Sequence, residues 1–147
     1  MTGSTASMKR ITFQNGSVYE GPVKNGVIEG NGIYRWANGD VYEGQFKNGV
    51  IEGIGKKTWT DGTTYEGQWK NARMEGYGKK IYFNGDVYEG EFMDNDYNGQ
   101  GIYRWSNGSS YQGAWRNGFQ EGYGVYRSPE GGISKGEWKL GRLVQNY

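Results

Sequence analysis

The chain has 147 residues, of which 28 are glycine, 2 are proline and 16% are aromatic. Its 17 Lys and Arg residues nearly balance its 16 Asp and Glu residues, so the net charge of +1 creates no global field that would attract nucleic acid or an anionic bilayer. The sequence contains no Cys or His, which excludes disulfides, thiolate or imidazole metal ligands, and catalytic triads built from these residues. No apolar stretch approaches the roughly 20 residues that span a bilayer, and no signal peptide is visible. An intracellular, cytoplasmic protein is therefore the default expectation.

The first residues of the chain are small and polar and differ from everything that follows. We expect residues 1–8 to be a disordered tail or vector-derived residues, with Met8 a candidate native start. Residues 9–147 are expected to form a single repeat domain.

A Tyr-Glu-Gly or Tyr-Gln-Gly triplet recurs every 23 residues and organises this domain. The triplets begin at Tyr19, Tyr42, Tyr65, Tyr88 and Tyr111. A Gly-x-Gly follows in each repeat, and an Asn-Gly or Asp-Gly closes most repeats. Self-similarity at a fixed period is the signature of a repeat protein. We divide the domain into a partial unit 9–18, full units 19–41, 42–64, 65–87, 88–110 and 111–133, and a partial unit 134–147.

Each repeat alternates between two faces with a period of two, which predicts a hairpin of two short strands rather than a helix. In the second repeat, Tyr42, Gly44 and Phe46 share one face. If residues 47–52 close the hairpin as its tip, Phe46 lies opposite Gly53. Large rings then cover bare glycine backbone, so the sheet needs no second layer.

The links between successive hairpins determine whether the rings stay on one face. A two-residue turn at Asn38-Gly39 would carry the ring row to the wrong face. A three-residue link, 37–39, with Gly39 left-handed as a bulge, pairs Tyr34 with Tyr42 and keeps the row together. We therefore predict an all-β fold: a single-layer, elongated, twisted antiparallel sheet of tandem 23-residue β-hairpins.

The pattern Tyr-Glu-Gly-x-(Phe/Trp)-x-x-Gly-x-x-x-Gly-x-Gly resembles the membrane occupation and recognition nexus (MORN) repeat family, over about residues 9 to 141. This resemblance implies a single groove-shaped antiparallel sheet and roles in scaffolding, partner docking and proposed membrane association. The chain departs from the pattern at Val23, Ala72, Asn95, Ser128 and Ser134. The partial units at the ends are expected to act as caps.

The glutamates of the triplets form a ladder that could be mistaken for an acid and base pair. The predicted register places Glu43 opposite Lys56, which is an ordinary surface charge pair. We find no nucleophile, base or metal set in the sequence and predict a chain that is not an enzyme and has no cofactor or metal.

Aromatic residues line one face of the predicted sheet, and most of them are expected to form its core. Lys57 and Lys80 stand where other repeats have Tyr, so they either pack on rings as cations or bind a phosphate, a carboxylate or an acidic peptide. The predicted partner-binding groove consists of Tyr34, Trp36, Tyr42, Lys57, Trp59, Tyr65, Lys80, Tyr82, Tyr103 and Trp105.

Apolar residues also recur at the hairpin tips, where they either fold back over the sheet or bind a helix or peptide. The predicted tip edge consists of Ile28, Ile51, Met74, Tyr97 and Phe119. At the C-terminus, an open strand could pair with a second copy and form a homodimer. The predicted dimer edge consists of Leu140, Leu143, Val144 and Tyr147.

The reading favoured by these features is a non-catalytic scaffold or adaptor that docks a partner peptide or helix along the groove and the tip edge. One alternative is a peripheral membrane module with weak affinity for phosphoinositide, although net charge and the lack of a polybasic run weaken it. Another is a substrate-positioning segment of a larger enzyme. Association with the cytoskeleton would suit a scaffold, and association with the periphery of a membrane would suit a membrane module. No nucleic acid partner is expected.

Overall fold

The computed structural model describes residues 6–147, and every regular element in this range is a β-strand. Met1 to Thr5, part of the expected tail, lie outside the described residues. The chain divides into a first unit that ends at Arg73 and a second unit, Met74–Tyr147. Over residues 6–147 there is no helix that is long and apolar enough to cross a membrane.

In the first unit, all strands except the short β3 pair antiparallel in chain order, as the repeat pattern predicts. Strand β1 begins at Ser7, within the segment that the sequence assigned to the tail, because Ser7 and Met8 pair with Val23 and Pro22. The short strand β3 pairs with β2. The strands are β1 (Ser7–Thr12), β2 (Val18–Lys24), β3 (Val27–Ile28), β4 (Gly30–Arg35), β5 (Val41–Lys47), β6 (Val50–Thr58) and β7 (Thr64–Lys70).

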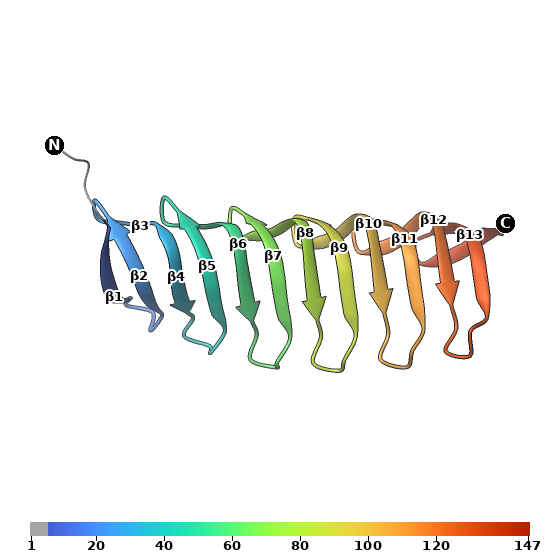
Figure 1. Cartoon of the computed structure of the whole chain (residues 1–147), viewed down its shortest axis with the longest axis horizontal. Helices are drawn as coiled ribbons and strands as arrows, with labels where there is room; N and C mark the ends of the chain where they lie inside the picture. Colours follow the sequence, from blue (N-terminus) through green and yellow to red (C-terminus); the bar gives the residue numbers. More distant parts are fainter. Residues whose placement is uncertain (1–5) are drawn as a thin grey trace. The chain divides into compact units, whose positions relative to one another are not determined.

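The second unit repeats the same arrangement, again with antiparallel pairing in chain order. Its strands are β8 (Arg73–Ile81, of which all but the first residue belong to this unit), β9 (Val87–Met93), β10 (Asp96–Arg104), β11 (Ser110–Arg116), β12 (Phe119–Arg127), β13 (Ile133–Lys139) and β14 (Arg142–Asn146). In both units the links and the tips lie at opposite ends of the strands (Figure 1). The prediction of an antiparallel array of tandem hairpins is confirmed.

The links have the predicted bulged geometry. The Trp36 amide donates to the Asp40 carbonyl at 2.9 Å, and the Gly39 amide donates to the Trp36 carbonyl at 3.0 Å. Gly39 has a φ of +103°, which an L side chain rarely adopts. Tyr34 consequently pairs with Tyr42, and the rings stay on one face.

The tips are tighter than predicted. Asn48 and Gly49 form a two-residue turn with φ values of +51° and +79°, as expected for a type I′ turn, and β6 begins immediately afterwards at Val50. Phe46 therefore pairs with Ile51, so the prediction that it lies opposite Gly53 is wrong. The cause is a bulge between the pair that Gly44 forms with Gly55 and the pair that Phe46 forms with Ile51. At this bulge the Ile54 amide donates to the Gln45 side chain at 2.6 Å.

The core consists of aromatic rings lying over glycine backbone, as the composition suggests. Tyr42 is 0% exposed, and its hydroxyl donates to the Gln45 carbonyl at 2.8 Å. Its ring packs edge to face against Phe46 at 5.2 Å and Trp69 at 5.5 Å. The Trp69 indole donates to the Gly55 carbonyl at 2.9 Å. The tyrosines that share this complete burial are Tyr19, Tyr42, Tyr65, Tyr88 and Tyr111.

The tips of successive repeats are hydrogen-bonded to one another. In the first unit, the Gly49 amide donates to the Ile28 carbonyl at 2.9 Å, and the Asn48 amide donates to the Glu29 carboxylate at 2.6 Å. In the second unit, the Leu140 amide donates to the Glu121 carboxylate at 3.1 Å. These bonds make each row of tips part of the folded structure rather than a set of independent loops.

Candidate functional site

A cavity of about 360 Å³ opens on the aromatic face of the first unit. Its ring walls include Tyr34 and Trp36, two half-buried side chains from the end of β4 and the following link. Their ring centroids lie 5.0 Å apart in an edge-to-face arrangement. The tips supply the other side of the cavity, so the rings and the tips form the two sides of a groove. The lining residues are Tyr34, Trp36, Phe46, Gly49, Val50, Ile51 and Ala72.

Lys57 lies beside this cavity and shares Trp36 with it. Its Nζ atom is 4.5 Å from the centroid of the Trp36 ring and 4.9 Å from that of Trp59. The Asp40 carboxylate is 4.0 Å away, and the Lys57 side chain is 20% exposed. Burial lowers the pKa of Lys57, while the charge of Asp40 opposes this effect. The structure therefore brings Tyr34, Trp36, Lys57 and Trp59 of the predicted groove together.

Two other residues of the predicted groove belong to the core instead. Tyr42 and Tyr65 are 0% exposed, so neither ring is available to a partner. Their burial has a tertiary cause, because Phe46 and Trp69 pack against them edge to face. The groove of the first unit consequently offers fewer aromatic side chains to a partner than the sequence predicted.

The remaining predicted groove residues gather in the second unit. Lys80 places its Nζ atom 4.9 Å from the centroid of the Tyr82 ring. Tyr82 and Tyr103 lie 6.1 Å apart, and Tyr103 and Trp105 lie 4.7 Å apart. The Tyr103 hydroxyl donates to the Asp86 carboxylate at 2.7 Å. Burial would raise the pKa of Asp86, but hydrogen bonds from Tyr103 and neighbouring groups hold it below its usual value.

The predicted tip edge is largely turned inward. Ile51 and Met74 are buried, and Ile28 and Tyr97 are half-buried. The Tyr97 ring stacks on Tyr88 at 3.9 Å. Most of this row therefore folds back over the sheet, which is one of the two roles that the sequence left open.

The prediction that Phe119 belongs to this row is wrong. Phe119 pairs with Arg116 and is 51% exposed, whereas Gln120 pairs with Trp115 in the way that Ile51 pairs with Phe46. The exposed apolar residues of the tips include Val27, Val50, Met93, Phe119 and Leu140. The sequence pattern also places Val27 and Val50 at the tips, as the pairs Val27-Ile28 and Val50-Ile51, but it does not tell which residue of each pair is the more exposed one.

The predicted dimer edge lies on the hairpin of β13 and β14. Leu143 pairs with Trp138 and is half-buried, while Leu140, Val144 and Tyr147 are exposed. The Tyr147 hydroxyl donates to the Glu137 carboxylate at 3.0 Å. Homodimer formation through this edge stays a prediction.

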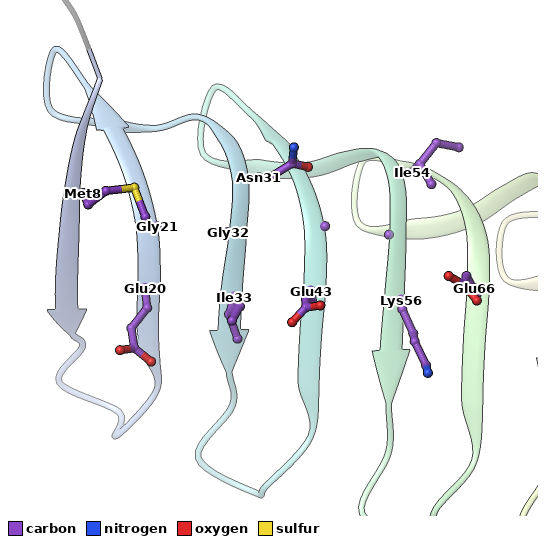
Figure 2. Close-up of a pocket in the computed structure, with 12 residues that line it drawn as sticks. Met8, Glu20, Gly21, Asn31, Gly32, Ile33, Glu43, Ile54, Lys56 and Glu66 are labelled. Carbon is purple, nitrogen blue, oxygen red and sulfur yellow. The ribbon is translucent and has the colours of Figure 1, made fainter.

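A larger hollow, of about 510 Å³, lies on the opposite face of the first unit (Figure 2). Lys56 pairs in register with Glu43 on one side and Glu66 on the other, as expected for a surface charge ladder. Arg35 and Glu20 form an ion pair at 2.8 Å on the same face. Within residues 6–147, no three Asp or Glu side chains cluster as they would around a metal ion. Despite its size, this hollow lacks the ring walls of the groove, which is the better candidate for binding.

Comparison with known proteins gives both structural similarities and a family. The chain is similar to the TCP domain of SAS-4 (dCPAP) of Drosophila melanogaster, solved in complex with a proline-rich motif of Ana2 (dSTIL), at 15% identity and a TM-score of 0.38 over 92% of this chain and 90% of that one. It is also similar to virginiamycin B lyase from Staphylococcus aureus, at 12% identity and a TM-score of 0.26, covering 93% of this chain but only 56% of the lyase chain. No curated protein matches the sequence.

The family comparison agrees with the repeat boundaries found in the sequence. The MORN repeat matches residues 19–41, 42–64, 65–87, 88–110 and 111–133 in tandem. These segments carry the buried tyrosines and the bulged links described above. The chain belongs to the MORN repeat family.

Proposed function

We propose that this chain is a non-catalytic docking scaffold that holds a peptide or helix of a partner protein in the aromatic groove of the first unit. One observation carries the proposal: Tyr34 and Trp36 remain half-buried beside a core that is already complete. The core ring of Tyr42 is sealed and its hydroxyl is hydrogen-bonded. The outer rings are therefore free to gain further burial against a partner, as aromatic side chains do at binding hot spots.

The size and rigidity of the groove support this role. A cavity of about 360 Å³ is near the lower end of the range for small-ligand pockets, roughly 300 to 1,000 Å³. Such a space suits one or two apolar side chains of a longer segment better than a whole metabolite. The hydrogen bond from the Gly49 amide to the Ile28 carbonyl holds the tip side of the groove in place, so little ordering of the protein is needed on binding.

Trp36→Ser removes the shared ring and is expected to leave the fold intact. Ser128 occupies the same position in the fifth repeat, where its link keeps the same backbone hydrogen bonds. A library of random twelve-residue peptides displayed on phage would be selected on the full chain, and the recovered peptides would be measured by fluorescence anisotropy. We expect Trp36→Ser to weaken their binding by about tenfold or more.

Tyr77→Ser is the matched control, because Tyr77 is an exposed ring, 56% accessible, that lies outside the groove. It should change the affinity by less than about twofold. Thermal melting of both variants would establish that each is folded. Peptides that bind wild type and Trp36→Ser equally well would contradict docking in this groove.

A second candidate, peripheral membrane binding, has one observation in its favour. At the tips of the first unit, the exposed Val27 and Val50 pair with Lys24 and Lys47, which combines apolar and basic groups. Co-sedimentation with phosphatidylcholine vesicles containing phosphatidylinositol bisphosphate, at physiological salt, would test it. Binding that survives replacement of both lysines by Gln would contradict this role for the tips.

A further inference from the structure

The ammonium group of Lys57 is held in the groove mainly by rings. Trp36 and Trp59 attract its charge through their faces, at 4.5 Å and 4.9 Å. An ammonium also has three N–H donors, which favour oxygen acceptors. The nearest carboxylate oxygen, on Asp40, is 4.0 Å away and therefore beyond hydrogen-bond distance.

Asp40 is already occupied by other donors. One of its oxygens accepts the Thr60 amide at 3.0 Å, and the other accepts the Asn38 side chain at 3.3 Å. Within the part of the chain that the structure describes, the ammonium group of Lys57 has no hydrogen bond to a protein acceptor. Its donors are consequently open to a group that enters the groove.

In the second unit, a side chain at the same position of the repeat does form a hydrogen bond to a protein acceptor. There Tyr103 takes the place of Lys57, and Asp86 takes the place of Asp40. The Tyr103 hydroxyl donates to Asp86 at 2.7 Å. At this position tyrosine thus forms a hydrogen bond to the aspartate of the preceding link, whereas lysine does not. A purely structural role therefore does not explain why Lys57 stands here.

The surroundings of Lys57 also favour binding of an anion. Burial lowers its pKa, with Asp40 only partly compensating, which indicates that the charged form would gain from a further partner. An ion pair formed in such a partly desolvated site is screened less than one on the open surface. Because Trp36 lies in both sites, an anion on Lys57 would sit next to an apolar group in the cavity.

We infer that Lys57 is the receptor for a carboxylate of the docked partner, an Asp or Glu side chain that neighbours an apolar residue seated in the cavity. This inference rests on the proposed docking function and adds the chemical class of the partner, an acidic peptide with an apolar anchor. A single carboxylate matches the single ammonium. The neighbouring Asp40 carboxylate repels any anion, and it would repel a phosphate dianion about twice as strongly as a carboxylate.

Adjacent lysines provide a matched pair of variants. Lys56 lies on the opposite face, in register with Glu43 and Glu66, and is exposed. Peptides recovered from the random twelve-residue library would be synthesised with each Asp or Glu intact and replaced by Asn or Gln. Their affinities would be measured for wild type, Lys57→Met, Lys57→Tyr and Lys56→Met. Lys57→Tyr guards against misfolding, since tyrosine occupies this position in three other repeats, as Tyr34, Tyr103 and Tyr126.

The recovered peptides should carry an acidic residue beside an apolar one. Both Lys57 variants should weaken their binding by about tenfold or more, the acid-to-amide change should cause a similar loss in wild type, and the two losses should not add. Lys56→Met should change affinity by less than about twofold. Increasing the salt concentration should weaken the acidic peptides and spare the amide versions.

Other outcomes would overturn the inference in distinguishable ways. Peptides that require Trp36 but are indifferent to Lys57→Met would refute the carboxylate receptor and leave the docking function standing. A library that yields no Trp36-dependent peptide would refute both. If Lys57→Met instead abolished binding to vesicles containing phosphatidylinositol bisphosphate and left peptide binding unchanged, the anion would be a lipid headgroup and the inference would be wrong.

Discussion

The phenol ring of Tyr42 lies directly against the backbone of Gly55 on the next strand. A methyl group on Gly55 would collide with the ring and hydroxyl of Tyr42. The hydroxyl is also fixed, because it donates to the Gln45 carbonyl at 2.8 Å. Ring and glycine therefore depend on each other, and this pair is the unit from which each repeat is built.

Replacing Gly55 with Ala should cost about 3 kcal/mol or more of unfolding free energy, because the ring cannot move without losing its hydrogen bond. Urea denaturation followed by tryptophan fluorescence would measure the loss. The control is Gly26→Asn, at a tip where an added Cβ meets nothing within 4 Å and where Asn95 occupies the same place in another repeat. A loss for Gly55→Ala no larger than for this control would contradict the ring-on-glycine core.

Ala72 adopts a left-handed conformation at a tip, with φ at +63°, where Gly49 stands one repeat earlier. A left-handed conformation costs an L residue roughly 1 to 2 kcal/mol of stability, and glycine avoids this cost. Glycine also increases the conformational entropy of the unfolded chain, which offsets part of the gain. We expect Ala72→Gly to stabilise the protein by up to about 1 kcal/mol in urea denaturation. Ala37→Gly, in a link and without positive φ, should be neutral or destabilising. Equal effects from both substitutions would argue against strain at Ala72.

Asp86 connects two successive links in the second unit. Its carboxylate accepts the Ser106 amide at 2.8 Å and the Tyr103 hydroxyl at 2.7 Å. Asp86→Ala should therefore lower the unfolding free energy by about 1 to 3 kcal/mol, since both donors lose their acceptor. Tyr103→Phe removes only one of the two bonds and should cost less, about 1 kcal/mol. If thermal or urea unfolding ranked the two variants in the reverse order, the bridging role of Asp86 would be excluded.

The buried tyrosines predict how stability depends on alkaline pH. Burial raises the pKa of Tyr42 and of Tyr111 to about 12, against an ordinary value of 10.0. The neutral phenol is thus favoured in the folded state, so this contribution is fully present below pH 10 and is lost as pH rises from 10 through 12. Above pH 10, tyrosinate absorbance and loss of near-ultraviolet circular dichroism should rise together. Complete titration of all 13 tyrosines near pH 10 in a protein that remains folded would refute this prediction.

Much of the fold follows from local sequence chemistry. The alternation around Tyr42 and Gly44 sets the two faces of a strand, and the period of 23 residues with a bulged link at Gly39 keeps the rings on one of them. The tip was predicted less well. Its register depends on an added bulge near Gly53, and a bulge shifts the pairing without changing the residue pattern that precedes it.

The sequence by itself determined the hairpin repeat, the family and the pairing of Tyr34 with Tyr42, because strand alternation and turn geometry act over a few neighbouring residues. Only the tertiary structure decided which rings remain open to a partner. Tyr42 is sealed by Trp69 of the next repeat, while Trp36 stays half-buried beside Lys57. Exposure depends on neighbours that are distant in sequence, so similar aromatic residues of one repeat become core or groove according to what packs over them.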